Sequence, residues 1–426
     1  MSETNVIVGA GQAGGWAAVA MRQAGFAGRI LLIGEEPYRP YERPPLSKTV
    51  LTAASEPPVT WFHSEARYAD LGIELVLGTA VTALDVTARR IGLADGREIG
   101  WDKLLLATGG RARRLAVPGG ERALVLRTLG DARVLRARLG DARRVVCIGA
   151  GVIGLEIAAS ARARGASVTV LEAAERPMGR SVSAEGAAFV AGLHRNAGVD
   201  LRCGVAVAAI EARADGSEVV LCADGAAFPA DLVVAGVGME RNLALAEAAG
   251  LVLDGGVVVD ALARTSAECV FAAGDLATFP HPLFGGRMRL ESWRHAQNHG
   301  IAAGQVMAGA GKPYDDVPWF WTDQFGVNLQ VAGLPGLAAR TVVRVAPPAG
   351  FVAVHMAADD RVVGVTAANA PREIRAGMAL IRAGRAVDAE LVGDATVALQ
   401  GLAAGVQPRN GFRNEHADGG PGSGRL

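Results

Sequence analysis

Short apolar runs alternate with longer, alanine-rich stretches through about the first 310 residues of the chain. Apolar runs of strand length beside stretches of helix length predict parallel β-sheets covered by helices, the α/β class. One unit of this pattern occurs twice, with a glycine-rich turn and a helix between two strands. Its strands are Asn5–Val8 and Arg29–Ile33 in the first copy, and Arg144–Ile148 and Ser167–Leu171 in the second. We therefore expect two Rossmann-like domains of similar design.

The pattern changes beyond about residue 318. Short apolar segments separated by polar turns predict antiparallel strands at Leu329–Ala332, Arg340–Val345, Phe351–Ala357 and Arg361–Thr366. Apolar residues at helical spacing follow over Arg372–Ala383. These elements predict a small α+β domain. From about Val406 onward Gly, Pro and charged residues dominate, so a disordered tail is expected at 406–426.

Each copy of the repeat contains a G-x-G-x-x-G turn, GAGQAG over Gly9–Gly14 and GAGVIG over Gly149–Gly154. Such a turn lets the backbone approach a pyrophosphate, which the N-terminus of the following helix attracts. Glu35 and Glu172 end the next strands, where a carboxylate can accept hydrogen bonds from ribose hydroxyls. Two glycine-hinged units that bind nothing are the alternative, but the repeated context favours two dinucleotide sites.

Glu172 also predicts which nicotinamide cofactor is preferred. A 2′-phosphate about 4 Å from this carboxylate would cost on the order of 4 kcal/mol per charge pair at an effective dielectric constant near 20. Solvent reduces this cost, and Arg176 is close enough in sequence to offset part of it. We expect at least a roughly tenfold preference for NADH over NADPH.

Charge and apolar content exclude two classes of partner. Lys plus Arg and Asp plus Glu both number 43, so the chain shows no electrostatic signature of nucleic-acid or membrane-surface binding. The longest apolar stretches, such as Asp231–Met239, are shorter than a membrane span. The N-terminal residues lack the basic region of a signal peptide, so they are interpreted as the first strand.

Cysteines and histidines predict neither a redox disulfide nor a metal site. The four cysteines form no C-x-x-C pair, which indicates reduced structural thiols in a cytoplasmic protein, at Cys147, Cys203, Cys222 and Cys269. Four histidines lack metal-ligand spacing backed by a second cluster, namely His281, His295, His299 and His355.

The stretch EEPYRPYERPPLSK (Glu35–Lys48) points to a known family. It resembles the FAD-dependent, NADH-oxidising ferredoxin reductases of bacterial aromatic-ring dioxygenase and cytochrome P450 systems, most of all the reductase component of phenylpropionate-type dioxygenases. Further similar motifs follow in the same order over about residues 5–400: LLLATG, LRTLGDA, GAGVIGLE, MGRSVS, FAAGD, LESWRHAQNHG and PWFWTDQFGVNLQVAG.

The resemblance implies a glutathione-reductase-like architecture with FAD and NADH as cofactors. It implies an FAD-binding domain over 1–112 and 242–318, an NAD-binding domain over 113–241 and a C-terminal α+β domain over 319–405. The cofactor-binding residues that it implies are Gly9, Gly11, Gln12, Ala13, Gly14, Glu35, Arg43, Lys48, Val81, Ala107, Thr108, Gly109, Arg127, Asp275, Trp293, Gly149, Gly151, Val152, Ile153, Gly154, Glu156, Glu172, Arg180, Gly236 and Gly238.

Some of these residues have specific expected roles. The resemblance places the FAD ribose on Glu35, the adenine at the backbone of Val81 and the ribityl chain on Asp275. An aspartate that caps a turn is the alternative for Asp275. Arg43 and Arg127 would face the phosphates or the flavin, and Trp293 would approach the flavin edge.

Lys48, Glu156 and Trp321 are the expected catalytic residues. The chain has only three lysines, so a lysine at 48 suggests a position where the broader guanidinium of arginine does not fit. The resemblance pairs Lys48 with Glu156 beside the flavin, where the ammonium would stabilise negative charge on the reduced ring. A solvated surface lysine is the alternative.

The resemblance also implies a separate protein as the electron acceptor. The stretch Tyr41–Lys48 contains no cysteine, so electrons are expected to leave the flavin singly, to a 2Fe-2S ferredoxin. Trp321 and Trp319 would contribute to its docking surface, although Trp319 could equally seal the C-terminal domain. Arginines that could attract an acidic ferredoxin are Arg287, Arg289 and Arg294.

Three rival functions stay open from the sequence. A thiol-dependent reductase or peroxidase is disfavoured by the cysteine pattern. An NADH oxidase and a flavin-bound, NADH-sensing interaction protein distantly related to apoptosis-inducing factor remain alternatives. A homodimer is a further open question.

Overall fold

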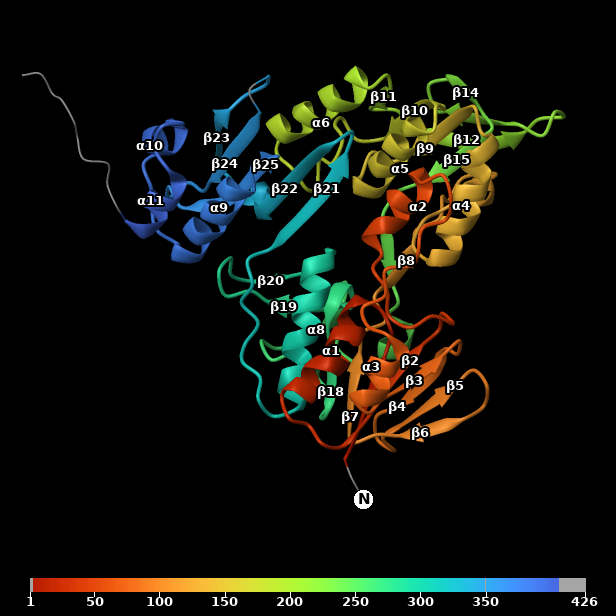
Figure 1. Cartoon of the computed structure of the whole chain (residues 1–426), viewed down its shortest axis with the longest axis vertical. Coiled ribbons are helices and arrows are strands. Elements are labelled where there is room, and N and C mark those ends of the chain that lie inside the picture. The colour runs from red at the N-terminus through yellow and green to blue at the C-terminus, as the bar shows by residue number, and fades with distance from the viewer. Residues whose placement is uncertain (1–2, 349, 406–426) are drawn as a thin grey trace, which may run out of the picture.

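The structure, a computed structural model, describes residues 3–348 and 350–405. The chain folds into three units, of which the first lies at the bottom of Figure 1, the second at the upper right and the third at the upper left. The disordered tail expected at 406–426 lies outside the described residues.

A parallel five-stranded sheet is the centre of the first unit, in the order β18-β7-β1-β2-β3. Its strands are β1 (Thr4–Val8), β2 (Arg29–Gly34), β3 (Ile73–Leu77), β7 (Lys103–Leu106) and β18 (Val270–Ala272). Side chains alternate between its faces, so Ile7 packs under two long helices, α1 (Gln12–Gln23) and α8 (Trp293–Met307). Val6 and Val8 face the opposite core, which is covered by β4 (Val81–Asp85), β5 (Arg90–Leu93), β6 (Glu98–Gly100) and α7 (Ala244–Ala248).

Short elements complete the first unit and connect it to the second. The short helices and strands are η1 (Pro44–Ser47), α2 (Thr49–Thr52), α3 (Glu65–Asp70), η3 (Gly274–Leu276), β17 (Val257–Val258), β19 (Ala277–Pro280) and β20 (Arg287–Met288). Two of them, η1 and α2, pack against the second unit. The chain crosses between the units along the antiparallel pair β8 (Gly110–Ala112) and β16 (Met239–Arg241). These crossings lie next to the domain boundaries expected at 112/113 and 241/242.

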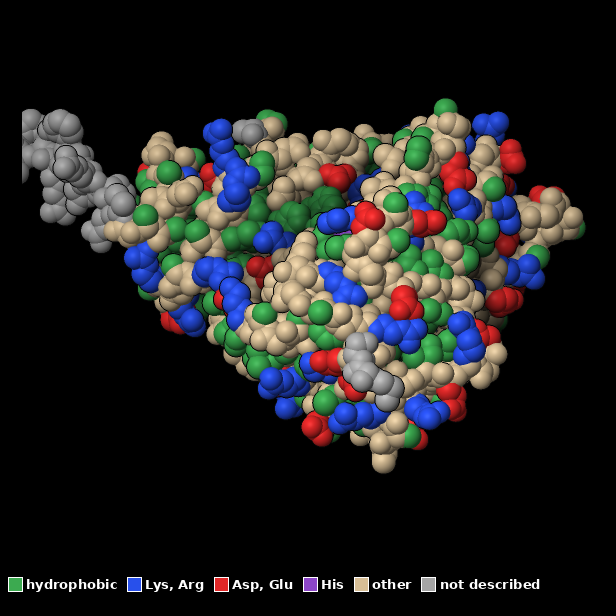
Figure 2. All heavy atoms as spheres, turned by 60° about the horizontal axis from the view of Figure 1, so that its bottom comes forward, with side chains coloured by type: hydrophobic (Ala, Val, Ile, Leu, Met, Phe, Trp, Pro, Cys, Tyr) green, Lys and Arg blue, Asp and Glu red, His purple; other side chains and the backbone are tan. Residues whose placement is uncertain are grey.

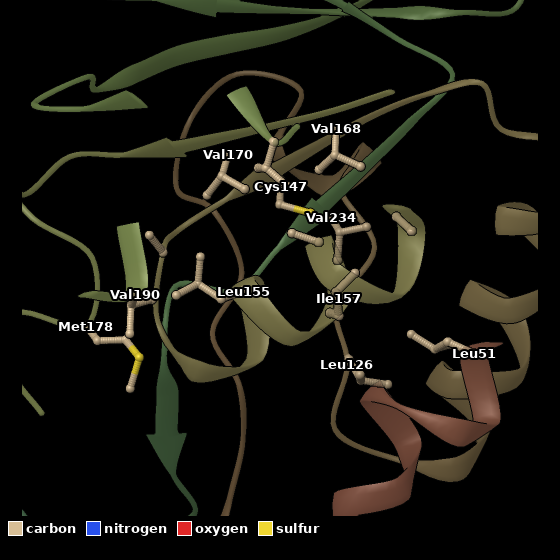
Figure 3. Close-up of a cluster of buried hydrophobic side chains, with 14 of the residues drawn as sticks. Leu51, Leu126, Cys147, Leu155, Ile157, Val168, Val170, Met178, Val190 and Val234 are labelled. Carbon is tan, nitrogen blue, oxygen red and sulfur yellow. The ribbon is translucent and has the colours of Figure 1, made fainter. Parts of the chain in front are cut away.

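The second unit repeats the design of the first around a parallel four-stranded sheet, in the order β11-β10-β9-β15. Its strands are β9 (Arg144–Ile148), β10 (Ser167–Glu172), β11 (Asp200–Cys203) and β15 (Leu232–Ala235). It also holds η2 (Gly120–Arg122), α4 (Leu129–Asp141), α5 (Val152–Ala163), α6 (Ala184–Asn196), β12 (Val207–Ala212), β13 (Glu218–Cys222) and β14 (Ala227–Ala230). Figure 3 shows Cys147, Val168 and Val170 of this sheet packed near Leu155 of α5.

The third unit is an antiparallel sheet in the order β21-β22-β25-β24-β23, with helices on one face. Its elements are β21 (Trp319–Gln324), β22 (Val327–Gly333), η4 (Pro335–Leu337), β23 (Arg340–Val345), β24 (Phe351–Met356), β25 (Val362–Ala368), α9 (Pro371–Ala383), α10 (Ala389–Gly393) and α11 (Leu399–Ala404). The other face contributes Leu329, Val331 and Phe351 to the core of the second unit. Figure 1 shows β21 reaching from this sheet towards α5.

The predicted fold class is confirmed, and most predicted elements are present. The prediction was wrong at some strand ends: β22 is longer at both ends, and β25 begins one residue later and continues to Ala368. Across the described residues, no helix has the length and apolar character needed to cross a bilayer. Basic and acidic side chains are interspersed on the face that Figure 2 shows.

Candidate functional site

One large cavity lies between the first and second units and is lined by both glycine-rich turns. Its volume is about 2180 Å³. A pocket for one small ligand usually measures roughly 300–1,000 Å³, so this cavity has room for two dinucleotides. Of the cofactor residues expected from the sequence, all line the cavity except Gly14 and Gly154.

The first turn leaves space and unused donors for a pyrophosphate. It joins the end of β1 to α1, and Gly9, Gly11, Gln12 and Ala13 line the cavity. A Cβ atom on Gly11 would meet no protein atom within 4 Å, so a side chain there would enter the open space. No side chain caps the N-terminus of α1, so its first N–H groups are available to an anion.

The second turn has the same geometry at the start of α5, which also lacks a side-chain cap. Ile153, in the first turn of α5, is 41% exposed although apolar, and it lines the cavity. Glu172 accepts hydrogen bonds from the backbone N–H groups of Ala150, at 2.7 Å, and Ala174, at 2.9 Å. Its carboxylate is therefore fixed beside the turn, where a nucleotide ribose would lie.

The third glycine of each turn serves packing rather than cofactor contact. A Cβ atom on Gly14 would lie 1.9 Å from the Gly9 carbonyl oxygen, and one on Gly154 would lie 2.0 Å from that of Gly149. Any side chain there would push the helix away from the turn. Gly14 and Gly154, which were expected to contact the cofactors, therefore act indirectly, by letting the helix pack closely on the turn.

The two glutamates that follow β2 have different surroundings. Glu35 is exposed and lines the cavity, as expected of a ribose acceptor. Glu36, which the sequence reasoning missed, accepts a hydrogen bond from the Tyr41 hydroxyl at 2.6 Å and forms an ion pair with Arg43 at 2.7 Å. Glu36 therefore orients Arg43, which lines the cavity together with Val81.

Asp275 presents an unsatisfied acceptor beside the cavity. One carboxylate oxygen accepts from Arg127 at 3.3 Å, while the other, Oδ1, is buried without a partner. Burial raises the pKa of Asp275, against the opposing effect of Arg127. A buried orphan acceptor is costly unless a ligand satisfies it. The geometry fits a hydroxyl donor such as the ribityl chain of FAD.

The ion pair predicted between Lys48 and Glu156 is present, with Nζ 2.8 Å from Oε1. The Lys48 side chain is 20% exposed and lines the cavity, whereas that of Glu156 is 2% exposed. The Ser47 hydroxyl donates to the other carboxylate oxygen, and the Thr322 hydroxyl donates to Oε1 at 2.7 Å. Sequence reasoning missed both hydroxyl groups, because neutral hydroxyls give no pattern in a sequence.

Three tryptophans lie in series beside the pair. Trp293 and Trp321 line the cavity and meet edge to face at 5.5 Å, and Trp319 stacks on Trp321 at 5.2 Å. The indole of Trp293 donates to Glu42, whose pKa is raised by burial. Trp319 packs against the core of the third unit, so it contributes to sealing that unit.

The candidate arginines do not share one environment. Arg294 lies over the Trp319 ring at 5.6 Å and forms an ion pair with Asp316 at 3.4 Å. Arg289 instead lines a hollow of about 270 Å³ that adjoins the large cavity, together with Arg113, Arg180 and Arg241. Arg287 is exposed on β20.

Cysteines and histidines lie away from the chemistry of the cavity. The four cysteines are free thiols, none is among the residues that line the cavity, and burial raises the pKa of Cys147 to about 12. His295 and His299 are buried in α8, beside Phe279 and Tyr314. Within the described ranges, no group of three or more His, Cys, Asp or Glu side chains is placed to hold a metal ion.

Comparison with known proteins gives consistent matches along the chain. The family model "Pyridine nucleotide-disulphide oxidoreductase" matches residues 4–300, and "Reductase C-terminal" matches residues 319–403. The anthranilate 1,2-dioxygenase system ferredoxin–NAD(+) reductase component of Burkholderia cepacia is 40% identical over 398 residues, covering 93% of this chain and 98% of the relative.

Solved structures agree with these matches. The ferredoxin reductase of the CYP199A2 system from Rhodopseudomonas palustris superposes with a TM-score of 0.91 at 38% identity, covering 94% of this chain and all of that one. The reductase in a covalent putidaredoxin reductase–putidaredoxin complex gives a TM-score of 0.90 at 37% identity, covering 95% of this chain and 99% of that one. The chain therefore belongs to the pyridine nucleotide-disulphide oxidoreductase family, among the ferredoxin–NAD(+) reductases of oxygenase systems.

Proposed function

We propose that this protein oxidises NADH with FAD as its cofactor and passes the electrons singly to a ferredoxin that serves an oxygenase. One observation carries the proposal: a single cavity is lined by both glycine-rich turns and by the Lys48–Glu156 pair. Two nucleotides bound by the two turns would meet at that pair.

The residues position the cofactors rather than exchange protons with them. FAD, when bound, accepts a hydride from NADH and can release the two electrons one at a time. Direct hydride transfer needs no acid or base from the protein, only aligned rings and excluded water. Ile153 and Trp321 provide apolar walls for this, and Lys48 places a positive charge where the reduced ring becomes negative. Asp275 accepts from a cofactor hydroxyl.

The exit for electrons is the side that carries Trp321. Trp321 and Trp319 form a stacked pair that leads away from the cavity, and Arg294 lies over the outer ring. No cysteine is among the cavity-lining residues, so a thiol relay has no support there. The acceptor is a one-electron carrier of the 2Fe-2S type, and its acidic surface would meet Arg294.

The four free thiols support a reducing, cytoplasmic location.

The test is NADH-driven electron transfer by purified protein to a panel of 2Fe-2S ferredoxins, with oxygen as the competing acceptor. The protein is expected to be yellow, to be bleached by NADH and to reduce at least one ferredoxin much faster than oxygen. Protein that stays colourless after incubation with free FAD, or that transfers electrons only to oxygen, would contradict the proposal.

A further inference from the structure

A chain of buried hydrogen bonds extends from Glu156 into the third unit. The Thr322 hydroxyl lies 2.7 Å from Glu156 Oε1, and Gln324 Nε2 lies 2.9 Å from Thr322 Oγ1. His194 Nε2 lies 2.6 Å from Gln324 Oε1. Thr322, Gln324 and His194 are at most 3% exposed, so water does not replace these contacts.

The order of donors along this chain follows from the number of hydrogens each group has. An ionised carboxylate only accepts, so the one hydroxyl hydrogen of Thr322 points to Glu156. Thr322 must then accept from the amide NH₂ of Gln324. The Gln324 oxygen therefore accepts from His194, whose ring carries its hydrogen on Nε2. Burial lowers the pKa of His194, which agrees with a neutral ring.

Every donor in the chain points towards Glu156. Bonds aligned in this way polarise one another, and the effect is larger where burial keeps the local dielectric constant low. The Glu156 carboxylate is thus held from three directions, by Lys48, by Ser47 and by Thr322. Without Thr322, oxygen Oε1 would keep only Lys48 as a partner.

The Glu156 carboxylate and its three donors come from three parts of the molecule. Lys48 and Ser47 belong to the first unit, Glu156 to α5 of the second and Thr322 to β21 of the third. Residues two apart on a strand share a face, so Thr322 and Gln324 both point into the second unit. The third unit therefore lines the cavity with Phe320 and Trp321 and reaches the Lys48–Glu156 pair through the hydroxyl group of Thr322.

We propose that Thr322, supported by Gln324 and His194, is a positioning residue that fixes Glu156 and, through it, the Lys48 ammonium beside the flavin. The proposal rests on the proposed function and deepens it, because it makes flavin reduction depend on the third unit. Lys48 has one other protein acceptor, the Pro44 carbonyl at 3.3 Å, so a loosened Glu156 lets the ammonium turn away from the cavity.

Thr322→Val tests the proposal, because valine keeps the shape of threonine and removes only the hydroxyl. In the full-length FAD-loaded protein, flavin reduction by NADH should slow by about tenfold. The reduced flavin should also be destabilised by about tenfold, which for a two-electron couple lowers the midpoint potential by about 30 mV. Thr322→Ser keeps the hydroxyl and should restore both quantities to within about twofold of the original protein.

Thr366→Val is the matched control. Thr366 is also a buried threonine of the third unit. Its hydroxyl is bonded to His355 at 2.8 Å and does not contact the Glu156 chain. Thr366→Val should lower the unfolding temperature without changing the flavin midpoint potential. The proposal would be overturned if Thr366→Val shifted the flavin potential as much as Thr322→Val does, or if Thr322→Val left that potential unchanged. Failure of Thr322→Ser to restore the flavin potential and the reduction rate would also overturn it.

Two further measurements keep the outcome decisive. If Thr322→Val does not fold, Gln324→Leu breaks the next link and should shift the potential in the same direction by a smaller amount, and no shift would overturn the proposal. ¹⁵N NMR of the histidine rings should show His194 protonated on Nε2, and protonation on Nδ1 would contradict the donor order. Failure of the original protein to bind FAD would refute the proposed function itself, whereas normal reduction with an unaffected Thr322→Val would refute only this inference.

Discussion

The position of Lys48 is fixed before any cofactor binds. Its ammonium is held by Glu156 at 2.8 Å and by the Pro44 carbonyl at 3.3 Å, yet one fifth of the side chain faces the cavity. An ammonium oriented in this way adds to charge stabilisation without reorganising during the reaction. The 2% exposure of Glu156 keeps the pair largely out of water, where its attraction is stronger than on a surface.

Lys48→Met should slow flavin reduction by NADH. Methionine keeps the apolar stem and removes the charge, and a hydrogen bond to a charged group is worth roughly 1.5–3 kcal/mol. The rate constant should therefore fall by roughly 10- to 100-fold in stopped-flow measurements. Lys312→Met is the control, because Lys312 is exposed, and it should leave the rate unchanged. Equal rates in the Lys48 variant and the original protein would refute the role.

We expect Glu172 to set the preference for NADH over NADPH at the second turn. Its carboxylate is fixed by the N–H groups of Ala150 and Ala174, so it cannot easily move away from a 2′-phosphate. Glu172→Gln keeps an acceptor oxygen and removes the charge, so NADPH should gain at least roughly tenfold in kcat/KM relative to NADH. The exposed neighbour Glu175 serves as control, as Glu175→Gln should change this ratio far less. A protein that already uses NADPH as well as NADH would contradict the assignment.

At the scale of elements, β21 carries the tryptophans of the proposed electron exit on one face and the buried hydrogen bonds to Glu156 on the other. Alternation along the strand places Trp319 and Trp321 on one face, and Thr322 and Gln324 on the other. The tryptophan face lies beside the start of α8, where Trp293 completes the series. One strand therefore connects the proposed electron exit with the buried chain to Glu156.

Trp321→Ala should impair electron transfer to ferredoxin but not to a small acceptor. Removal of the indole leaves a gap between Trp293 and Trp319, so a docked ferredoxin would lose an aromatic contact. We expect the KM for ferredoxin to rise by about tenfold, the usual scale of a central aromatic contact. Ferricyanide needs no docking surface, so the rate at which already reduced flavin passes electrons to it should stay within about twofold. Unchanged ferredoxin kinetics in a folded variant would exclude Trp321 from the interface.

Sequence patterns predict strands built on continuous apolar runs, such as β1, β2 and β9, better than strands of mixed composition. The strands β1, β2, β9 and β23 end within one residue of their expected positions. By contrast, β21 carries aromatic and polar residues on both of its faces, so apolar and polar positions do not alternate, and the sequence indicated a motif there but no strand. The glycine-rich turns, Glu35 and Glu172 could be expected from their fixed spacing to a strand, whereas Asp275 was expected only from the resemblance of FAAGD to the family motif.

At the scale of the whole molecule, the sequence did not allow contacts between distant segments to be predicted. Ser47 and Thr322 are separated by most of the chain, and both donate to Glu156. Phe351 of β24 stacks on Phe189 of α6 at 4.9 Å, which joins the third unit to the second. Such contacts arise when units with complete sheets share one core, and no local pattern records them.

Buried neutral histidines make the folded molecule sensitive to acid. His355 is completely buried between Thr341, at 3.1 Å, and Thr366, at 2.8 Å, and burial lowers its pKa to about 4. Burial lowers the pKa of His299 to about 3. An unfolded chain takes up these protons near pH 6.5, the ordinary histidine pKa, while the folded protein does not. The contribution of these neutral histidines to the free energy of unfolding is therefore fully present above about pH 6.5, and it is lost as the pH falls towards 4.

His355→Gln should flatten this dependence. A pKa difference of about 2.5 units corresponds to at most about 3 kcal/mol of unfolding free energy lost between pH 6.5 and pH 4. Glutamine can keep one bond to a threonine hydroxyl but takes up no proton. The variant should be less stable than the original protein at pH 7, and the two should converge as the pH falls. Urea unfolding at several pH values measures this, with His63→Gln as control, because His63 is only partly buried and should contribute much less. Parallel curves for His355→Gln and the original protein would mean that His355 is already protonated in the folded state.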